Sequence, residues 1–569
     1  MENVVSTSIF DDLKLQIFDK SKWKKGKFMV FGYEAGLGKS LTTQRYLAES
    51  EERALYVQRF VKDGALDETV ERINKIAGDK VAVRLAEEEI TKIKARKRAI
   101  GARVLCITHQ LYYSICRGKH KDLIQGRSIL IIDEYPDLLE QITVSSREIG
   151  QLWATFYQYG FKETDELASL FRDLIRDYSY SSEIQKKKEM IFVNFNEEKY
   201  DKYKEVIEKL FKKADQIKKA EHKELLYKFQ QLLHNGGYFY EYAFHTVDTT
   251  PQFAMLESNI VLDANAEQDY RYALSNKFHV INQPKVYDNS NAVFYHYDVN
   301  TSKKALKGYK NLTEKALEQI DLKGCSGLLF ITEKGQKENV EKEIKKFFGK
   351  SLEELQKTFG FPISIDYFGN LIGKNSYRVY NTVVMLKTPF FSCETYTLSK
   401  FLYSCMENLP IGNISIFQDE VVEKIRVSTI AGEMYQAIRR IARNNPGEAK
   451  IYVFNNNQEV IDMVLEQLPG IQYDKRQIEV ENVRERVGGK VKAKKEKKPT
   501  KFDLTVEKVK VILTNLKQLD VKDIQKEEVR IEAGVKDKSN FSKMLIALKP
   551  FLETNQIDKD TNKQRFIFR

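Results

Sequence analysis

Residues 33–40 (YEAGLGKS) combine residue types that together bind phosphate groups. Glycines in such a turn let backbone N–H groups approach the phosphates, the lysine can reach the β- and γ-phosphates, and the hydroxyl can bind Mg²⁺. Apolar residues 28–31 predict a strand before the turn, and residues 41–48 predict a helix after it. We therefore expect this loop to bind ATP and Mg²⁺, through Gly36, Leu37, Gly38, Lys39 and Ser40.

Tyr33 departs from this pattern, because it stands where the phosphate-binding motif usually has its first glycine. Gly32 lies one residue too early to take that place. The sequence alone offers no physical reason for a tyrosine here.

Residues 128–134 form a continuous aliphatic run that ends in two adjacent carboxylates, Asp133 and Glu134. Such a run predicts a strand that is buried on both faces. Asp133 could hold Mg²⁺ through its water shell, and Glu134 could polarise the water that attacks the γ-phosphate. The alternative is an ordinary core strand that ends in a solvated acidic turn. The phosphate-binding loop upstream favours the catalytic interpretation.

Residues 54–58 and 104–108 predict two further strands that end in polar residues. In parallel α/β folds, loops at these carboxyl ends carry the ligand contacts. The pattern resembles superfamily 2 helicases, and the resemblance implies that Gln58, Thr108 and His109 contact the sugar-phosphate backbone of a nucleic acid. For His109, a partly buried histidine with satisfied ring nitrogens is the alternative.

Two other segments resemble helicase motifs less closely. Residues 259–266 are similar to the strand end that couples hydrolysis to movement between lobes, although Asn265 stands where threonine is common, and a plain polar turn is the alternative. Residues 368–375 precede an apolar strand and resemble an element that contacts nucleotide and nucleic acid. This resemblance implies binding roles for Gly373 and Asn375, against the alternative of a simple glycine-containing loop.

A polar and basic segment at residues 435–443 resembles the helicase pattern Gln-x-x-Gly-Arg-x-x-Arg, with Gln436, Arg440 and Arg443 in register and Arg439 in place of glycine. The planar guanidinium stabilises charge on a transferring γ-phosphoryl group and stays ionised when partly buried. We expect Arg440 and Arg443 on one helix face, aimed across a cleft between two lobes. A helix face of solvated arginines is the alternative.

The resemblance to superfamily 2 helicases implies two RecA-like parallel-sheet lobes. The predicted fold class is therefore α/β, with a helical insert in the first lobe and a small C-terminal winged-helix domain. Alternating strands and helices after residue 327 support the second parallel sheet. The expected domains are residues 1–145 for the first lobe with its two ATP motifs, 146–250 for a mostly helical insert, 251–285 for the end of the first lobe, 286–483 for the second lobe, 484–501 for a basic flexible linker, and 502–569 for the winged-helix-like domain.

Apolar residues at helical spacing within 203–211 and 225–233 predict two amphipathic helices in the insert. A helical hairpin packed on the first lobe is favoured over an element that separates strands. The aromatic residues 238–244 are strand-like, and core packing is favoured over stacking on bases.

The C-terminal residues 502–569 show helix-turn-helix spacing followed by a basic hairpin, and they resemble a winged helix. This resemblance implies that the third helix presents basic and polar side chains to the major groove and that the hairpin contacts phosphates. The candidate DNA-binding residues are Lys538, Asn540 and Lys543 on the helix, and Lys559, Lys563 and Arg565 on the hairpin. Binding to a protein instead is the alternative.

The composition of the 569 residues fits a globular protein with a polyanionic partner, since hydrophobic residues make up 42% and the net charge is +12. No apolar run could span a bilayer and no secretory signal is evident, so we expect a cytoplasmic protein without membrane contact. The five scattered cysteines predict reduced thiols rather than a disulfide framework, zinc or an iron–sulfur cluster.

These observations predict an ATP hydrolase that acts as a DNA helicase or translocase on single-stranded or forked DNA and binds duplex through its C-terminal domain. A phage or mobile element that uses it in replication or recombination is our hypothesis for its origin. RNA remains an alternative substrate, and the sequence identifies no protein partner. The rival functions are a non-unwinding, DNA-bound ATPase switch and the motor subunit of a defence or restriction assembly.

Overall fold

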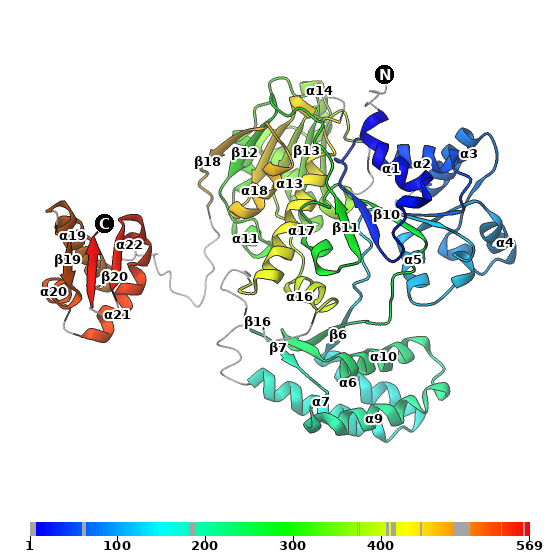
Figure 1. Cartoon of the computed structure of the whole chain (residues 1–569), viewed down its shortest axis with the longest axis horizontal. Coiled ribbons are helices and arrows are strands. Elements are labelled where there is room, and N and C mark those ends of the chain that lie inside the picture. The colour runs from blue at the N-terminus through cyan, green and yellow to red at the C-terminus, as the bar shows by residue number, and fades with distance from the viewer. Residues whose placement is uncertain are drawn as a thin grey trace. The chain divides into compact units, whose positions relative to one another are not determined.

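The computed structural model forms two compact units, residues Met1–Val483 and Arg484–Arg569, which we describe separately. It describes residues 7–59, 64–180, 189–371, 374, 376–404, 409–410, 417–443, 446–481, 501–519, 521–535, 537–560 and 564–568. Figure 1 labels the helices and strands of both units.

The first lobe is built on a seven-stranded sheet in the order β11-β1-β10-β5-β2-β4-β3. All of its strand pairs are parallel. The strands are β1 (Phe28–Phe31), β2 (Ala54–Gln58), β3 (Ala82–Arg84), β4 (Val104–Thr108), β5 (Ile129–Asp133), β10 (Ser258–Leu262) and β11 (Phe278–Ile281), and the helices are α1 (Asp11–Phe18), α2 (Lys39–Glu49), α3 (Ala65–Ala77), α4 (Ile93–Gly101) and α5 (His109–Cys116). The aliphatic strands are buried because helices cover both faces of the sheet.

The second lobe repeats this architecture with a six-stranded sheet in the order β14-β13-β15-β17-β12-β18, again with parallel pairs. The strands are β12 (Val293–Tyr297), β13 (Leu328–Thr332), β14 (Ile363–Tyr367), β15 (Thr382–Met385), β17 (Lys450–Phe454) and β18 (Gln472–Arg476). The helices are α11 (Lys303–Gly308), α12 (Leu312–Gln319), α13 (Lys337–Phe348), α14 (Leu352–Phe359), α15 (Phe368–Leu371), α16 (Cys393–Phe401), α17 (Glu420–Ile438) and α18 (Gln458–Glu466). Two such sheets are typical of paired RecA-like lobes, so the α/β prediction is confirmed.

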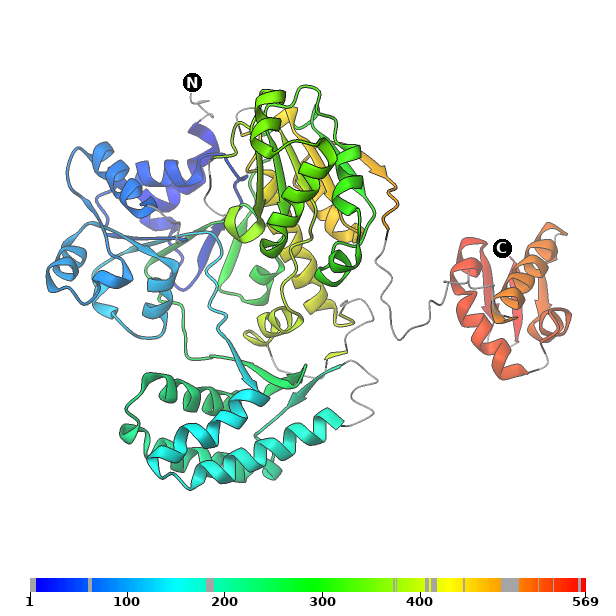
Figure 2. The ribbon, with the colours of Figure 1, turned by 180° about the vertical axis from the view of Figure 1, so that it is seen from behind.

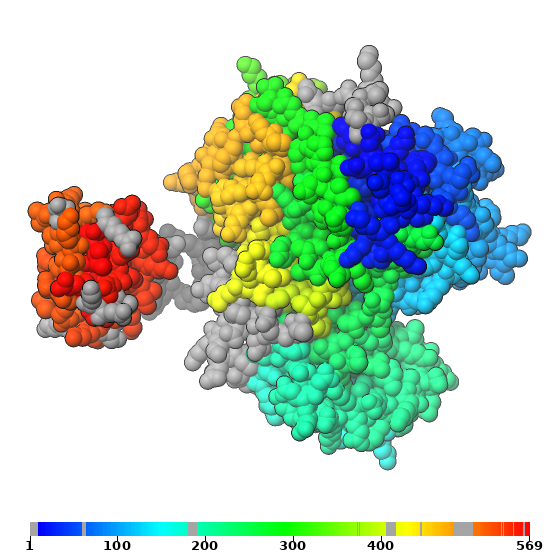
Figure 3. Space-filling model, in the orientation of Figure 1, coloured from blue at the N-terminus to red at the C-terminus, as the bar shows by residue number. Residues whose placement is uncertain are grey.

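The insert contains the helices that the sequence predicts, but it is not a simple helical hairpin, because these helices pack on a sheet. Its helices α6 (Ser146–Phe156), α7 (Glu163–Tyr180), α9 (Asp201–Phe211) and α10 (Ala220–Asn235) pack on an antiparallel sheet, ordered β16-β7-β8-β9-β6, whose strands are β6 (Gln141–Ser145), β7 (Glu189–Val193), β8 (Gly237–Tyr240), β9 (Ala243–Val247) and β16 (Leu409–Pro410). Two connections, residues 134–140 and 248–257, join it to the first lobe (Figure 2). The space-filling view shows the insert as a body of its own beside the lobes (Figure 3).

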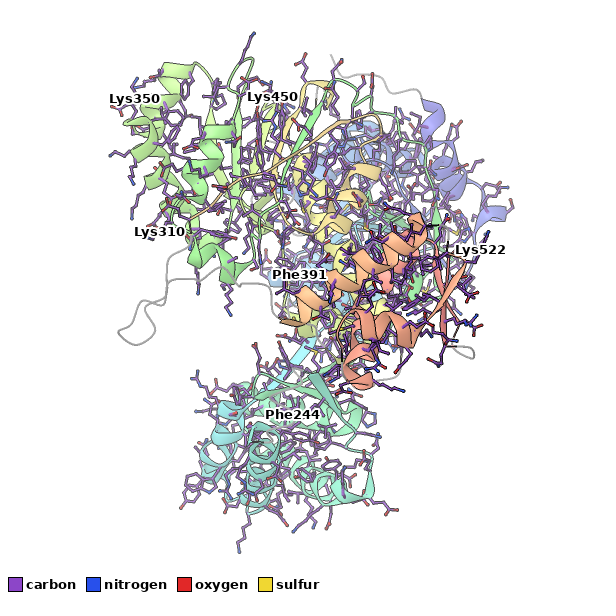
Figure 4. The ribbon with its side chains drawn as sticks, turned by 90° about the vertical axis from the view of Figure 1, so that its left-hand side faces the viewer. Phe244, Lys310, Lys350, Phe391, Lys450 and Lys522 are labelled. Atoms are coloured by element: carbon purple, nitrogen blue, oxygen red, sulfur yellow. The ribbon has the colours of Figure 1, made fainter. Side chains whose placement is uncertain are left out.

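The aromatic residues 238–244 form a hairpin rather than one strand, because Glu241 and Tyr242 turn the chain with φ of 47° and 63°. Phe244, labelled in Figure 4, is fully buried in the core of the insert together with Phe239. Core packing, which the sequence favours, therefore describes Tyr238, Phe239 and Phe244, whereas Tyr242 at the turn is 62% exposed.

The C-terminal unit has its own buried core and a three-stranded antiparallel sheet, ordered β19-β21-β20. Its elements are α19 (Lys501–Gln518), β19 (Asp523–Gln525), α20 (Lys526–Glu532), α21 (Lys538–Ala547), α22 (Lys549–Thr554), β20 (Ile557–Asp560) and β21 (Arg565–Phe568). The helices and the final hairpin fall where the sequence places them, and their assignment to a winged helix stays a prediction.

Within the described ranges, no helix combines the length and the apolar character that crossing a membrane requires. The four cysteines that the structure describes are free thiols.

Candidate active site

The phosphate-binding loop connects β1 to the first turn of α2. Gly36 and Gly38 have φ of 90° and 91°, in the left-handed region that side chains with a Cβ rarely adopt. Gly38 is the N-cap of α2, so Lys39 and Ser40 open the helix. A Cβ added at Gly38 would meet open space, so the positive φ rather than crowding favours glycine here. The sequence therefore folds into the turn that phosphate binding needs.

Tyr33 points away from this loop and into the core. Its side chain is 1% exposed, and its ring lies 4.7 Å from that of Phe10 and 5.7 Å from that of Phe31, measured between centroids. Burial raises the pKa of its phenol well above the ordinary value. The tyrosine thus anchors the start of the loop to the N-terminal helical segment, which gives the physical reason that the sequence does not supply.

Replacing Tyr33 with alanine should lower the free energy of unfolding by about 3–5 kcal/mol, because a buried aromatic ring is removed. Denaturant unfolding measures this change. ATP affinity should change little, since the ring does not face the cleft. Tyr157, which is 70% exposed, provides the control through Tyr157→Ala. A stable Tyr33→Ala variant without ATP binding would contradict this assignment.

Ser40 and Asp133 meet at the carboxyl end of the sheet. The Ser40 hydroxyl donates to Oδ2 of Asp133 at 2.6 Å, and the Tyr56 hydroxyl lies 3.3 Å from the same oxygen. Burial raises the pKa of Asp133, while Lys39 and the Ser40 hydrogen bond oppose that shift. A hydroxyl and a carboxylate are the hard oxygen donors that Mg²⁺ prefers, so these two residues fit the metal that the sequence predicts here.

Glu134 lies one residue beyond the strand, with φ of 77°, and its backbone N–H donates to the Leu262 carbonyl at 3.0 Å. Its carboxylate accepts a hydrogen bond from Arg59 at 3.0 Å. Burial alone would raise the pKa of Glu134, but the charge of Arg59 and its hydrogen bond, with Lys39 and Arg440, lower it below the ordinary value. The group therefore stays ionised beside the loop.

The arginine segment of the second lobe differs in conformation from the prediction. Helix α17 ends at Ile438, so Arg440 and Arg443 follow the helix instead of sharing one of its faces. The chain turns away at Ala442, whose φ is 48° and whose N–H donates to the Tyr380 carbonyl at 2.6 Å. This tertiary hydrogen bond ends the helix earlier than the local sequence suggests.

Both arginines nevertheless line the same cleft as the phosphate-binding loop. A cleft of about 380 Å³ lies between the lobes. Its lining includes Gly36, Gly38, Lys39, Ser40, Gln58, Arg59, Asp133, Glu134, Ala264, Gln436, Arg440 and Arg443. Burial lowers the pKa of Arg443 to about 10 and lowers that of Arg440, where Glu134 and Glu433 oppose the shift. Both groups remain cations near neutral pH, and the cleft places them opposite Lys39.

The three residues expected at the nucleic-acid strand are largely buried. Gln58 accepts a hydrogen bond from Thr69 at 2.9 Å and lines the cleft just described. Thr108 caps α5 by accepting from the Leu111 N–H, and it donates to Glu87. The structure therefore places both side chains against protein partners rather than at an open surface, and their binding role stays a prediction.

His109 matches the alternative interpretation better. Its Nε2 donates to the Asp133 carbonyl at 2.8 Å, and burial lowers its pKa, so the ring is neutral. It lines a second cavity of about 230 Å³, whose wall also contains Arg59, Glu134 and Gln436. His109 thus forms a hydrogen bond to the backbone at the end of β5, the strand that carries Asp133.

The remaining candidates divide into two groups. Gly373, Asn375 and Lys563 lie outside the residues that the structure describes. Lys538, Asn540 and Lys543 are exposed on α21, and Lys559 on β20 is exposed too. Arg565 donates to Asp523 at 2.6 Å, so part of its hydrogen-bonding capacity is already used within the sheet.

The strand end at Asp263 and Asn265 contacts the second lobe. The Asn265 N–H donates to Asp263 at 2.9 Å, and Tyr272 donates to the same carboxylate at 2.8 Å. A Cβ added to Gly432 of α17 would come within 2.9 Å of the Asn265 amide nitrogen. A larger residue at 432 would therefore displace the Asn265 side chain, which lies close to α17.

Sequence reasoning missed three charged residues of this region: Arg59, Glu34 and Arg439. Arg59 directly follows Gln58 at a strand end, and this position was the available signal. Arg439 was visible only as a departure from the helicase pattern, and Glu34 as an acidic residue inside a phosphate-binding loop.

Comparison with known proteins identifies the fold. No family model matches the sequence, and no curated protein matches it either. Among solved structures, Xpd4 from S. tokodaii is similar with a TM-score of 0.50 at 14% identity, over 82% of this chain and 99% of that chain. An XPD helicase gives a TM-score of 0.47 at 12% identity, over 84% and 100%. Lhr from Mycobacterium smegmatis, bound to ssDNA and AMP-PNP, gives 0.32 at 10% identity, over 96% and 57%.

The likeness to Xpd4, at 14% identity, shows the fold alone. The residues of the cleft must therefore carry any statement about chemistry.

Proposed function

We propose that this chain is an ATP-dependent DNA helicase or translocase. One observation carries the proposal: a single cleft joins Lys39, Asp133 and Glu134 of the first lobe to the arginine segment of the second. An ATP-driven motor needs groups from both lobes at one nucleotide, because closing and opening the cleft then follows binding and hydrolysis.

Each residue has a distinct task in this proposal. Lys39 and the loop N–H groups would hold the phosphates, and Ser40 and Asp133 would hold Mg²⁺, which would neutralise phosphate charge. Glu134 orients and polarises the attacking water. Gln436, Arg440 and Arg443 stabilise charge on the γ-phosphoryl group from the opposite wall.

The contact between Asn265 and Gly432 supports a route from hydrolysis to movement. The turn at 263–265 follows β10, which pairs with the strand carrying Asp133. The turn therefore lies between Asp133 and α17, where a shift of Asp133 would act on the contact with Gly432. Alternating grip on a strand that crosses both lobes would convert this motion into steps. We propose single-stranded or forked DNA as the tracked strand, and replication or recombination of a phage or mobile element as the role.

Two measurements test this function. ATPase rates with single-stranded DNA, duplex DNA and RNA, compared side by side, should show the largest stimulation by single-stranded DNA. Strand displacement on tailed duplexes should then require ATP. Robust hydrolysis without displacement or translocation on any substrate would contradict the helicase function and favour a non-unwinding ATPase switch. Stimulation by RNA alone would contradict the choice of DNA.

Removing residues 484–569 tests the C-terminal unit as a duplex anchor. Both units have cores of their own, so the remaining chain should hydrolyse ATP normally. Duplex affinity should fall, and the dependence of log K on log salt should flatten by about 1 for each phosphate that a lysine of this unit neutralises in the full chain. Fluorescence anisotropy at several salt concentrations measures both. An unchanged affinity and salt slope would show that this unit is not the anchor.

A further inference from the structure

A buried ion pair links the phosphate-binding loop to the second lobe. Nη2 of Arg439 lies 3.2 Å from Oε1 of Glu34, and the side chains are 6% and 0% exposed. Glu34 belongs to the loop between β1 and α2, and Arg439 directly follows α17. The two residues are thus far apart in the sequence, and each directly precedes a residue that lines the cleft, Ala35 and Arg440.

Residues 286–289, which connect the two lobes and are called the connector, also take part in this contact. The N–H groups of Val286 and Tyr287 donate to Oε2 of Glu34 at 2.5 and 3.1 Å. Asn289 accepts from Nη1 of Arg439 at 3.1 Å. Glu34 therefore uses one carboxylate oxygen for the connector and the other for the second lobe, while Arg439 contacts both the loop and the connector.

Aromatic rings complete the surroundings of Arg439. Its guanidinium lies 5.0 Å from the ring centroid of Tyr287 and 5.5 Å from that of Tyr435. The Tyr287 hydroxyl would lie 3.6 Å from a Cβ placed on Gly36, so the connector also covers the phosphate-binding loop. Cation–π contacts of this kind favour arginine over a smaller or neutral side chain.

The backbone of Arg439 also accepts a hydrogen bond from Arg443, one of the candidate catalytic residues. Nε of Arg443 donates to the Arg439 carbonyl at 3.0 Å, and Arg440 is the next residue in the chain. A displacement of Arg439 therefore moves both arginines relative to Lys39. Small shifts in such positions matter, because misplacing a catalytic group by about 1 Å can slow a reaction by about 10²-fold.

We propose that Glu34 and Arg439 are positioning residues for ATP hydrolysis: their buried pair fixes the phosphate-binding loop relative to Arg440 and Arg443 through the connector at 286–289. This inference rests on the proposed ATPase function. It also assigns a task to Arg439, which stands where the helicase pattern has glycine. Neither residue needs to touch the nucleotide, since each acts through its neighbours.

Two single variants and their combination test the proposal. Glu34→Gln and Arg439→Met each leave one buried partner unsatisfied, and both should be less stable than the wild type. The double variant removes both charges and should regain most of that stability. Its kcat should still be about 10²-fold below the wild type, with KM for ATP changed less than about threefold, because methionine cannot join Asn289 to the loop.

Hydrogen exchange of the nucleotide-free protein gives a readout that is independent of hydrolysis. The amides of Val286 and Tyr287 should exchange faster in all three variants, because their acceptor on Glu34 is no longer held in place. The matched control is Gln268→Ala, which removes a contact between the lobes outside the cleft, the 3.0 Å hydrogen bond to Glu466. This control should keep the wild-type kcat and the wild-type exchange at 286–287.

The outcomes separate the competing explanations. A stable double variant with slow hydrolysis and fast exchange supports the positioning role. Recovery of the wild-type kcat together with stability would show that the pair is only structural and would overturn the proposal, as would unchanged exchange at 286–287 in the single variants. A wild-type protein without ATPase activity would instead refute the proposed function, and the exchange data would still report on the pair.

Discussion

Replacing Glu134 with glutamine is expected to lower kcat for ATP hydrolysis by about 10²–10⁴-fold, the range that general-base catalysis contributes. Glutamine keeps the shape of the side chain but cannot accept the proton of the attacking water. The carboxylate lies in the cleft with Lys39 and is ionised, since Arg59 outweighs the effect of burial on its pKa. Glu134 directly follows Asp133, the carboxylate proposed to bind Mg²⁺, and both residues line the cleft.

Steady-state ATPase assays and binding of a non-hydrolysable ATP analogue measure the two sides of this prediction. The analogue should bind Glu134→Gln as tightly as the wild type, because Ser40, Lys39 and Asp133 are unchanged. Glu49→Gln is the matched control, since Glu49 ends α2 at the far side from the loop. An unchanged kcat in Glu134→Gln would remove Glu134 from the role of base.

The first lobe was predictable because its signals are local. The aliphatic run before Asp133 can be satisfied only by a strand that is buried on both faces, and glycines at 36 and 38 are needed for the left-handed turn. The order of strand, loop and helix follows from these residues alone. The same reasoning located β2 and β4 with the bounds that the structure gives them.

The errors arose where distant residues decide the structure. Helix α17 ends before Arg440 because the Ala442 N–H pairs with Tyr380, a contact that no local pattern reveals. The sheet of the insert was missed because its turn at Glu241 and Tyr242 lacks glycine, although both residues adopt positive φ. Side-chain pairs such as Arg59 with Glu134 are likewise set by the fold, over a separation of 75 residues.

In the cleft too, local sequence predicted some features and distant contacts determined others. Sequence motifs identified most of the residues that line it, but they did not show how the two walls are held together. That information lies in the pair of Glu34 and Arg439, which spans 405 positions. The residue that departs from the helicase pattern thus supplies the contact between loop and arginine segment.

Replacing Arg440 with alanine is expected to reduce kcat by about 10³-fold or more, the effect of losing an arginine that stabilises a transferring phosphoryl group. Arg440 lies in the cleft from the second lobe, and burial lowers its pKa without removing its charge. ATP affinity should fall much less, since Lys39 and the loop of the first lobe hold the phosphates. The loss should therefore appear mainly in kcat.

Arg440→Lys distinguishes geometry from charge. Lysine keeps a cation but lacks the planar fork, so we expect kcat to remain at least about tenfold below the wild type. Arg476→Ala is the control, because Arg476 lies on β18 and pairs with Asp474 at 2.7 Å. If Arg440→Lys hydrolyses ATP as fast as the wild type, positive charge alone is sufficient at this position. If Arg440→Ala hydrolyses ATP as fast as the wild type, Arg440 does not stabilise the transition state. Hydrolysis would then depend on the first lobe and Arg443.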